Sequence, residues 1–248
     1  MAVFDDLVAE QDRLEAILAG LDEGEWELPS AAAGWSVADV VLHLAQTEEA
    51  VVASAAGHDL AVPSALVPDP ARQTVDEVMN QLVQAERAAP ASVFERWRAA
   101  RVAAAAALRA ADPKVPLAWV ERPLKPVTLA TTRLAEHWAH GLDITGPLGI
   151  GFPDTPRLRH VAWLAHRSMP YALALAGEQA SDVFCELTAP GGTGVWRYGS
   201  PGADTAITGS AGVFCRVAAH RLPALQSGLH VTGPLGATAL TVLRTYAV

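Results

Sequence analysis

Prolines and glycines divide the first 177 residues into alanine- and leucine-rich segments whose apolar residues recur at helical spacing. In the segment 4–21, leucine or isoleucine stands at positions 7, 14, 17, 18 and 21. A helix over this segment would be apolar along one face. Such faces are buried by packing helices against one another, so we predict a bundle of four antiparallel helices.

Local signals place the ends of these helices. Ser36 is followed three residues later by Asp39, and Thr74 by Glu77, which is the spacing of a capping box. Proline is tolerated in the first turn of a helix, and two later segments begin in this way. The proline-rich segments between the helices are predicted to be loops, including the one before Thr74. The predicted helices cover residues 4–21, 36–56, 74–111 with a break allowed at Pro90, 126–142, and 155–176.

The sequence changes character after Gly177. Residues 183–189 and 194–199 have the composition of short strands, and the Pro-Gly-Gly between them is typical of a hairpin turn. Two short helical segments flank residues 229–233 further on. We therefore predict an α+β fold with two domains, a helical bundle over 1–177 and a smaller α+β domain over 178–248.

Charge and hydropathy narrow the choice of partners and compartment. The formal net charge is -9, and the 18 lysines and arginines form no basic stripe, which argues against nucleic acid as a partner. No apolar run is long enough to span a membrane, and the start of the chain lacks the pattern of a signal peptide. We expect a cytoplasmic monomer or homodimer that binds a small-molecule substrate. Cys185 and Cys215 have no metal-ligand spacing and are predicted to be reduced core thiols.

Three residues of the predicted bundle could share a metal ion. Glu136 and His140 are four residues apart, so they rise from the same face of one helix. His43 lies mid-way along another helix and could supply a third ligand, as facing helices do in bundle metal sites. The same residues could instead be a surface side-chain pair and a hydrogen-bonded core histidine. His137 and His140 form a rival pair, and spacing alone does not choose between them.

Two motifs resemble a known family. GWSVADVVLHLAQTE and RLAEHWAHGLDI are similar to the paired signature of the mycothiol-dependent maleylpyruvate isomerases, a branch of the DinB-like metalloproteins. The likeness continues through RLRHVAWLAHRSMPYAL and ITGSAGVFCRVAAHRL, so it covers essentially the whole chain. The resemblance implies a DinB-like four-helix bundle with a smaller C-terminal domain. It also implies a divalent ion, usually described as zinc in such proteins, on His43, Glu136 and His140.

Other residues could also belong to the site, Arg221 by the resemblance and the rest by their positions in the sequence. Arg221 matches a family arginine that reaches the active site, although Arg216 lies close by and an arginine near a helix end is often a solvated cap. Asp143, three residues after His140, could accept the imidazole N–H or could simply end the helix. Three tryptophans, at positions 35, 119 and 138, could line a pocket or belong to the core.

Three functions fit these features. The first is a metal-dependent enzyme that activates mycothiol, or water, for addition, isomerisation or S-transfer on a small electrophilic metabolite. The second keeps the metal but needs no thiol, and the ion acts as a Lewis acid for a cyclisation, elimination or hydrolysis. The third is a metal- or ligand-binding protein without catalytic activity.

Overall fold

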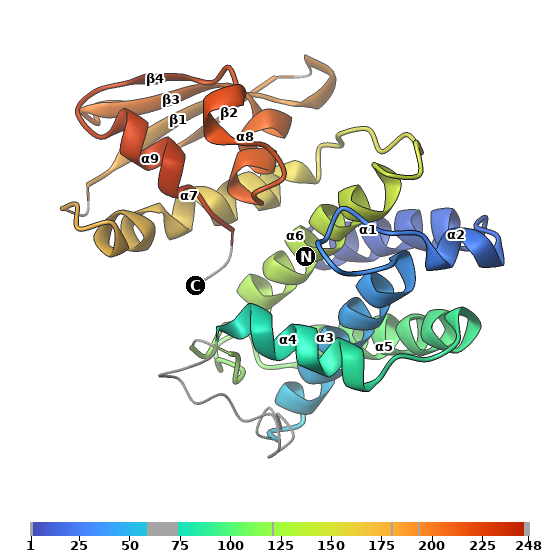
Figure 1. Ribbon diagram of the computed structural model, residues 1–248. Helices are drawn as coiled ribbons and strands as arrows, with labels where there is room; N and C mark the ends of the chain where they lie inside the picture. The colour runs from blue at the N-terminus through green and yellow to red at the C-terminus, as the bar shows by residue number, and fades with distance from the viewer. Residues whose placement is uncertain (1, 59–73, 121, 180, 193, 246–248) are drawn as a thin grey trace. The chain divides into compact units, whose positions relative to one another are not determined.

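The structure is a computed structural model, and it describes residues 2–58, 74–120, 122–179, 181–192 and 194–245. The Cα positions divide the chain into two compact units, one that ends at Phe152 and one that begins at Pro153. Figure 1 shows the helical first unit in blue to green and the mixed second unit in yellow to red. The loop predicted over residues 61–72 lies outside the described residues.

The first unit is a helical bundle. Its long helices α1, α3, α5 and α6 pack together: α3 lies along α5, α1 contacts α5 and α6, and α6 also contacts α3. Two shorter helices, α2 and α4, lie against α3. The bounds are α1 Ala2–Leu18, α2 Glu23–Glu27, α3 Val37–Ala55, α4 Val75–Ala85, α5 Pro90–Ala110 and α6 Pro126–Thr145.

Capping residues fix where the helices begin. The Ser36 hydroxyl accepts a hydrogen bond from the Asp39 amide, and the Asp39 carboxylate accepts one from the Ser36 amide. Arg87 adds two hydrogen bonds of 2.8 Å to the same carboxylate. Burial alone would raise the pKa of Asp39, but the bonds from Arg87 and Ser36 outweigh burial, and the pKa is lowered. The start of α3 is therefore held by a charged, fully paired cap.

Two features of the bundle add detail to the sequence-based expectation. The region 74–111, predicted as a helix with a possible break at Pro90, forms two helices, because Pro90 occupies the first turn of α5 and cannot continue α4. The turn after α1 contains a short helix, α2, which the sequence pattern did not indicate. Its capping box joins Asp22 to Glu25, and its Trp26 is buried against the core.

The second unit combines a four-stranded sheet with helices. The sheet has the order β2-β1-β3-β4, in which β1 pairs antiparallel with β2 and parallel with β3, and β3 pairs antiparallel with β4. Helices α7 and α8 contact β1. The bounds are α7 Leu158–Leu175, β1 Val183–Thr188, β2 Val195–Tyr198, β3 Thr205–Ser210, α8 Ala211–Ala218, β4 His230–Thr232 and α9 Gly236–Val242.

This architecture confirms the α+β class predicted from the sequence, with helices first and a small sheet after them. The predicted hairpin is present as β1 and β2. The unit boundary falls earlier than residue 177, because α7 packs on α8, α9 and the sheet of its own unit. No helix in the described part of the chain is long and apolar enough to cross a membrane.

Candidate metal centre

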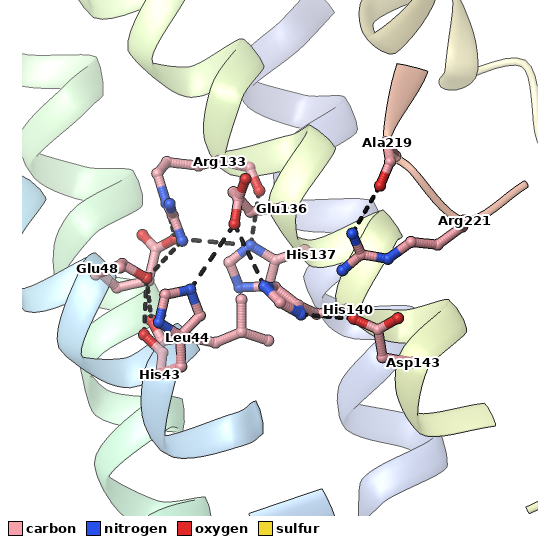
Figure 2. A network of polar contacts seen from close by, with 11 residues as sticks. His43, Leu44, Glu48, Arg133, Glu136, His137, His140, Asp143, Ala219 and Arg221 are labelled. Atoms are coloured by element: carbon pink, nitrogen blue, oxygen red, sulfur yellow. Dashed lines mark hydrogen bonds and ion pairs between the residues drawn. The ribbon is translucent and has the colours of Figure 1, made fainter. Parts of the chain in front are cut away.

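Three side chains from two helices meet inside the first unit. His43 lies on α3, whereas Glu136 and His140 lie one turn apart on α6. Glu136 Oε2 is 3.4 Å from His140 Nε2 and 3.8 Å from His43 Nε2. Figure 2 shows both imidazoles directed at this carboxylate. Among the described residues, this group has the composition and spacing of a metal site, with all three donor atoms within 4.8 Å of one another.

The distances suit a divalent ion better than direct hydrogen bonds. Both Glu136 contacts are longer than the 2.7–3.2 Å of an ordinary N–H···O bond. Two ligands held about 2.1 Å from a tetrahedral zinc ion lie roughly 3.4 Å apart. A carboxylate oxygen and two imidazole nitrogens are also an accepted donor set for zinc. The residues therefore fit a zinc-like ion with only small movements of their side chains.

His140 is oriented by a neighbour on its own helix. Its Nδ1 donates to Asp143 Oδ2 over 2.9 Å, and both side chains are buried. Because a carboxylate accepts at Nδ1, the lone pair of the neutral ring lies on Nε2, the atom that faces Glu136. Burial alone would lower the pKa of His140, but its hydrogen bond to Asp143 and the nearby Glu136 carboxylate outweigh burial and raise the pKa.

His43 has a more apolar environment. Burial lowers the pKa of this imidazole to about 4, so the ring is neutral and able to bind a metal at pH 7. Its ring centroid is 5.0 Å from that of His140 and 5.1 Å from that of Trp35. Trp35 also stacks at 6.4 Å on His140. Trp35 therefore forms one wall of the group, as the sequence analysis allowed.

Glu136 carries the negative charge of the group and is its most exposed residue. Burial alone would raise its pKa, but the facing imidazoles and the nearby Arg133 outweigh burial and hold the pKa well below the usual value. The carboxylate is therefore ionised at neutral pH. Its side chain keeps 29% of its surface exposed, whereas both imidazoles are buried. The carboxylate is thus the side of the group that solvent reaches most easily.

His137 points away from this group. Trp97 Nε1 donates to His137 Nε2 over 3.2 Å, and His137 Nδ1 donates to the backbone oxygen of Arg133 over 2.8 Å. Both nitrogens of this buried ring are thus already used in hydrogen bonds. Burial lowers the pKa of His137 to about 3, which keeps the ring neutral. The rival pair of His137 and His140 therefore does not form a site.

A buried ion pair lies beside the three residues. Arg133 Nε donates to Glu48 Oε1 over 2.9 Å (Figure 2). Arg133 Nη2 also donates to Thr47 Oγ1 over 2.7 Å. Both charged side chains are buried, and the pair joins α6, three residues before Glu136, to α3, five residues after His43. Sequence analysis missed this pair: Glu48 ends one of the two quoted motifs and Arg133 begins the other, but no spacing within either motif indicates that the two residues meet.

The other residues considered from the sequence lie in varied surroundings. Trp138 is buried in the core, and Trp119 is half-buried with Arg133 above its ring. In the second unit, Arg221 donates from Nη1 to the backbone oxygen of Ala219, just after α8. Arg216 instead pairs with Asp154 through two hydrogen bonds. The two cysteines, Cys185 and Cys215, are buried free thiols whose pKa values burial raises, as expected of core thiols.

Gly141, directly after His140, allows a close approach to α6. A Cβ atom at this position would lie 2.5 Å from Phe152 Cζ, and that ring is itself packed under the Arg13 guanidinium. Glycine inside a helix normally costs about 1 kcal/mol relative to alanine. Here the aromatic ring requires the absence of a side chain.

Replacing Gly141 by alanine is therefore expected to lower the free energy of unfolding by about 1–3 kcal/mol, because the added methyl overpacks against Phe152. Urea denaturation measures the change. The same substitution in a Phe152→Ala background should cost less than in the native chain, since the clashing ring is gone. A gain in stability from Gly141→Ala in the native chain would contradict this packing.

Comparison with known proteins gives the family. Residues 7–145 match the family model described as the mycothiol maleylpyruvate isomerase N-terminal domain. Two uncharacterized proteins of Mycobacterium tuberculosis, from strains H37Rv and CDC 1551 / Oshkosh, are each 32% identical over 244 residues. Those alignments cover 98% of this chain and 94% of each relative.

Two solved structures have a similar fold. The crystal structure of a mycothiol-dependent maleylpyruvate isomerase matches with a TM-score of 0.61 and 19% identity, over 95% of this chain and 92% of that one. A histidine-to-alanine variant of a mycothiol-dependent maleylpyruvate isomerase matches with a TM-score of 0.63 and 17% identity, over 94% of this chain and 95% of that one. The family model covers more than half of the chain, and the resemblance noted in the sequence is confirmed: the chain belongs to the mycothiol maleylpyruvate isomerase family.

Proposed function

We propose that the protein is a metal-dependent enzyme in which a mycothiol-type thiol acts on a small electrophilic metabolite, by isomerisation or S-transfer. The observation that carries the proposal is the convergence of His43, Glu136 and His140 from two helices of a domain that matches this family. The similar solved structures are those of mycothiol-dependent maleylpyruvate isomerases. This likeness supports the choice of a thiol as cosubstrate.

His43, Glu136 and His140 would hold the ion. Three protein ligands are the arrangement of catalytic zinc sites, which keep a position for an exchangeable group. A bound divalent ion supplies Lewis acidity and lowers the pKa of a thiol or water. The donor set favours zinc, since two imidazoles and a carboxylate suit it.

The surrounding residues would prepare the reaction. Trp35, which packs on both imidazoles, shields them from water on one side. The partly exposed Glu136 marks the side from which substrate and thiol would enter. In an isomerisation the sulfur bonds to an unsaturated carbon, the double bond becomes a single bond that rotates, and the sulfur leaves again. In S-transfer the C–S bond is kept.

A role for Arg221 in the active site stays a prediction, which the family resemblance suggests. A guanidinium binds carboxylates through paired hydrogen bonds, which would suit an acidic substrate. Replacing Arg221 by methionine should then raise KM or lower kcat while the metal content stays unchanged. Arg216→Met is the matched control for a nearby arginine. Equal turnover in the Arg221 variant and the native protein would exclude the role.

The proposal is tested by assaying purified, zinc-loaded protein with mycothiol and maleylpyruvate as the electrophile. We expect turnover that needs both the thiol and the metal, stops on chelation and returns when zinc is added. Isomerisation would leave the mycothiol concentration constant, whereas S-transfer would consume one thiol per substrate.

A panel of α,β-unsaturated carboxylates and other electrophiles extends the same assay beyond maleylpyruvate. Turnover that is independent of thiol would overturn the thiol role and favour a Lewis-acid enzyme. A protein that binds no divalent ion under these conditions would overturn the metal centre itself.

A further inference from the structure

We propose that Asp143 is a positioning residue that fixes the tautomer and orientation of His140 for metal binding, an inference that rests on the proposed metal centre. Three observations carry it: the hydrogen bond from His140 to Asp143, the burial of that carboxylate, and the different hydrogen bonding of the three histidines on α3 and α6.

The hydrogen bond selects one nitrogen of His140. Nδ1 donates to Asp143 Oδ2 over 2.9 Å, which leaves Nε2 as the atom with the lone pair, 3.4 Å from Glu136 Oε2. Imidazole binds a metal through an unprotonated nitrogen. Asp143 therefore directs the ligating atom of His140 toward the other two ligands. Both groups are buried, so water competes little with this bond.

The other two histidines lack this arrangement. His137 also has Nδ1 as its donor, but the Trp97 N–H occupies its Nε2 and no lone pair is left for a metal. His43 directs Nε2 at Glu136, and its buried Nδ1 has no hydrogen-bond partner in the described part of the chain. Of the three, only His140 combines an oriented ring with an Nε2 that faces Glu136.

The backbone of Asp143 holds a second part of the site in place. Its carbonyl oxygen accepts a hydrogen bond of 2.9 Å from the Ala31 amide, at the loop that leads to Trp35. Ser30 in this loop donates to the Trp35 carbonyl, and Trp35 packs on His43 and His140. A change confined to the Asp143 side chain keeps this backbone bond. The substitution Asp143→Asn therefore isolates the effect on the imidazole.

The test compares metal affinity in the native protein, in Asp143→Asn and in a control, Asp39→Asn. Asp39 is another buried carboxylate of the bundle, but its partners are Arg87 and Ser36 and not an imidazole. Competition with a chromogenic zinc chelator gives the dissociation constant of the folded protein. We expect Asp143→Asn to weaken zinc binding by about 10- to 100-fold, the usual effect of losing such a partner, and Asp39→Asn to change it little.

A second measurement reads the tautomer directly, in metal-free native protein at a pH where the ring of His140 is neutral. Long-range ¹H–¹⁵N correlation spectra should show a protonated Nδ1 in native protein and loss of that preference in Asp143→Asn. Unchanged zinc affinity in Asp143→Asn, or an unchanged tautomer of His140, would overturn the role of Asp143. If the native protein binds no zinc, the proposed centre fails, whereas native binding that Asp143→Asn leaves intact overturns only this inference.

Discussion

Replacing Arg133 by methionine is expected to lower the free energy of unfolding by about 3–5 kcal/mol, one of the two largest effects predicted for this chain. Its guanidinium is the hydrogen-bonding partner of Glu48, a carboxylate that is fully buried. Burial raises the pKa of Glu48, and the charge of Arg133 opposes that rise. Without the arginine, Glu48 must either remain charged in the core or take up a proton at a cost. Urea denaturation at pH 7 measures the loss.

Two comparisons separate burial from charge pairing. Arg96 forms a similar pair with Glu49 at 2.7 Å, between α5 and α3, but both side chains are substantially exposed. Arg96→Met should therefore cost about 1 kcal/mol or less. The double variant Arg133→Met with Glu48→Leu should recover much of the stability, because no unpaired charge remains in the core. A cost below about 1 kcal/mol for Arg133→Met alone would contradict this account.

The helices of the first unit could be predicted because their signals are local. The Ser36–Asp39 and Thr74–Glu77 capping boxes lie within four residues of sequence, and both form as expected. The proline at position 90 marked the only ambiguous region, and it divides two helices. Local chemistry decides such ends whatever the tertiary surroundings are.

The second unit was harder to predict because its strands pair with segments that are distant in sequence. Strand β3 was missed, since Thr205–Ser210 contains a single large apolar residue, Ile207, and reads as a polar loop. It is a strand because β1 pairs with it on one side and β4 on the other. Helix α7 was assigned to the bundle for a related reason, as its sequence does not show that its partners are α8, α9 and the sheet.

In the candidate site, too, the local features could be predicted from the sequence and the contacts between distant residues could not. Spacing predicted that Glu136 and His140 share a face of α6, and the structure places them there. Spacing alone could not choose between Glu136 and His137. That choice depends on Trp97, forty residues away in sequence, which occupies His137 Nε2. The pairing of Arg133 with Glu48 was invisible for the same reason, since 85 residues separate them.

Removing a metal ligand should have the largest effect on function. Replacing His43 by alanine takes away one of three donors and leaves Glu136 and His140 on a single helix. We expect the zinc affinity to fall by more than the roughly 100-fold that the loss of an outer hydrogen-bond partner can cost, and thiol-dependent turnover to be lost with it. Equilibrium competition with a chelator and elemental analysis of the purified variant measure the first effect.

The matched control is His137→Gln, on the same helix as Glu136 and even more deeply buried than His43. This variant loses the ring that Trp97 and the Arg133 carbonyl bind, so its free energy of unfolding should fall by about 1–3 kcal/mol. Its folded form should still bind zinc with nearly native affinity, because His137 Nε2 is already occupied by a hydrogen bond. The opposite pattern, zinc lost in His137→Gln and kept in His43→Ala, would move the centre to the rival histidine pair and refute the assignment of His43. We expect His137→Gln to lose stability and keep its zinc affinity, whereas His43→Ala should lose zinc affinity. Measuring both quantities therefore distinguishes a metal ligand from a buried structural histidine.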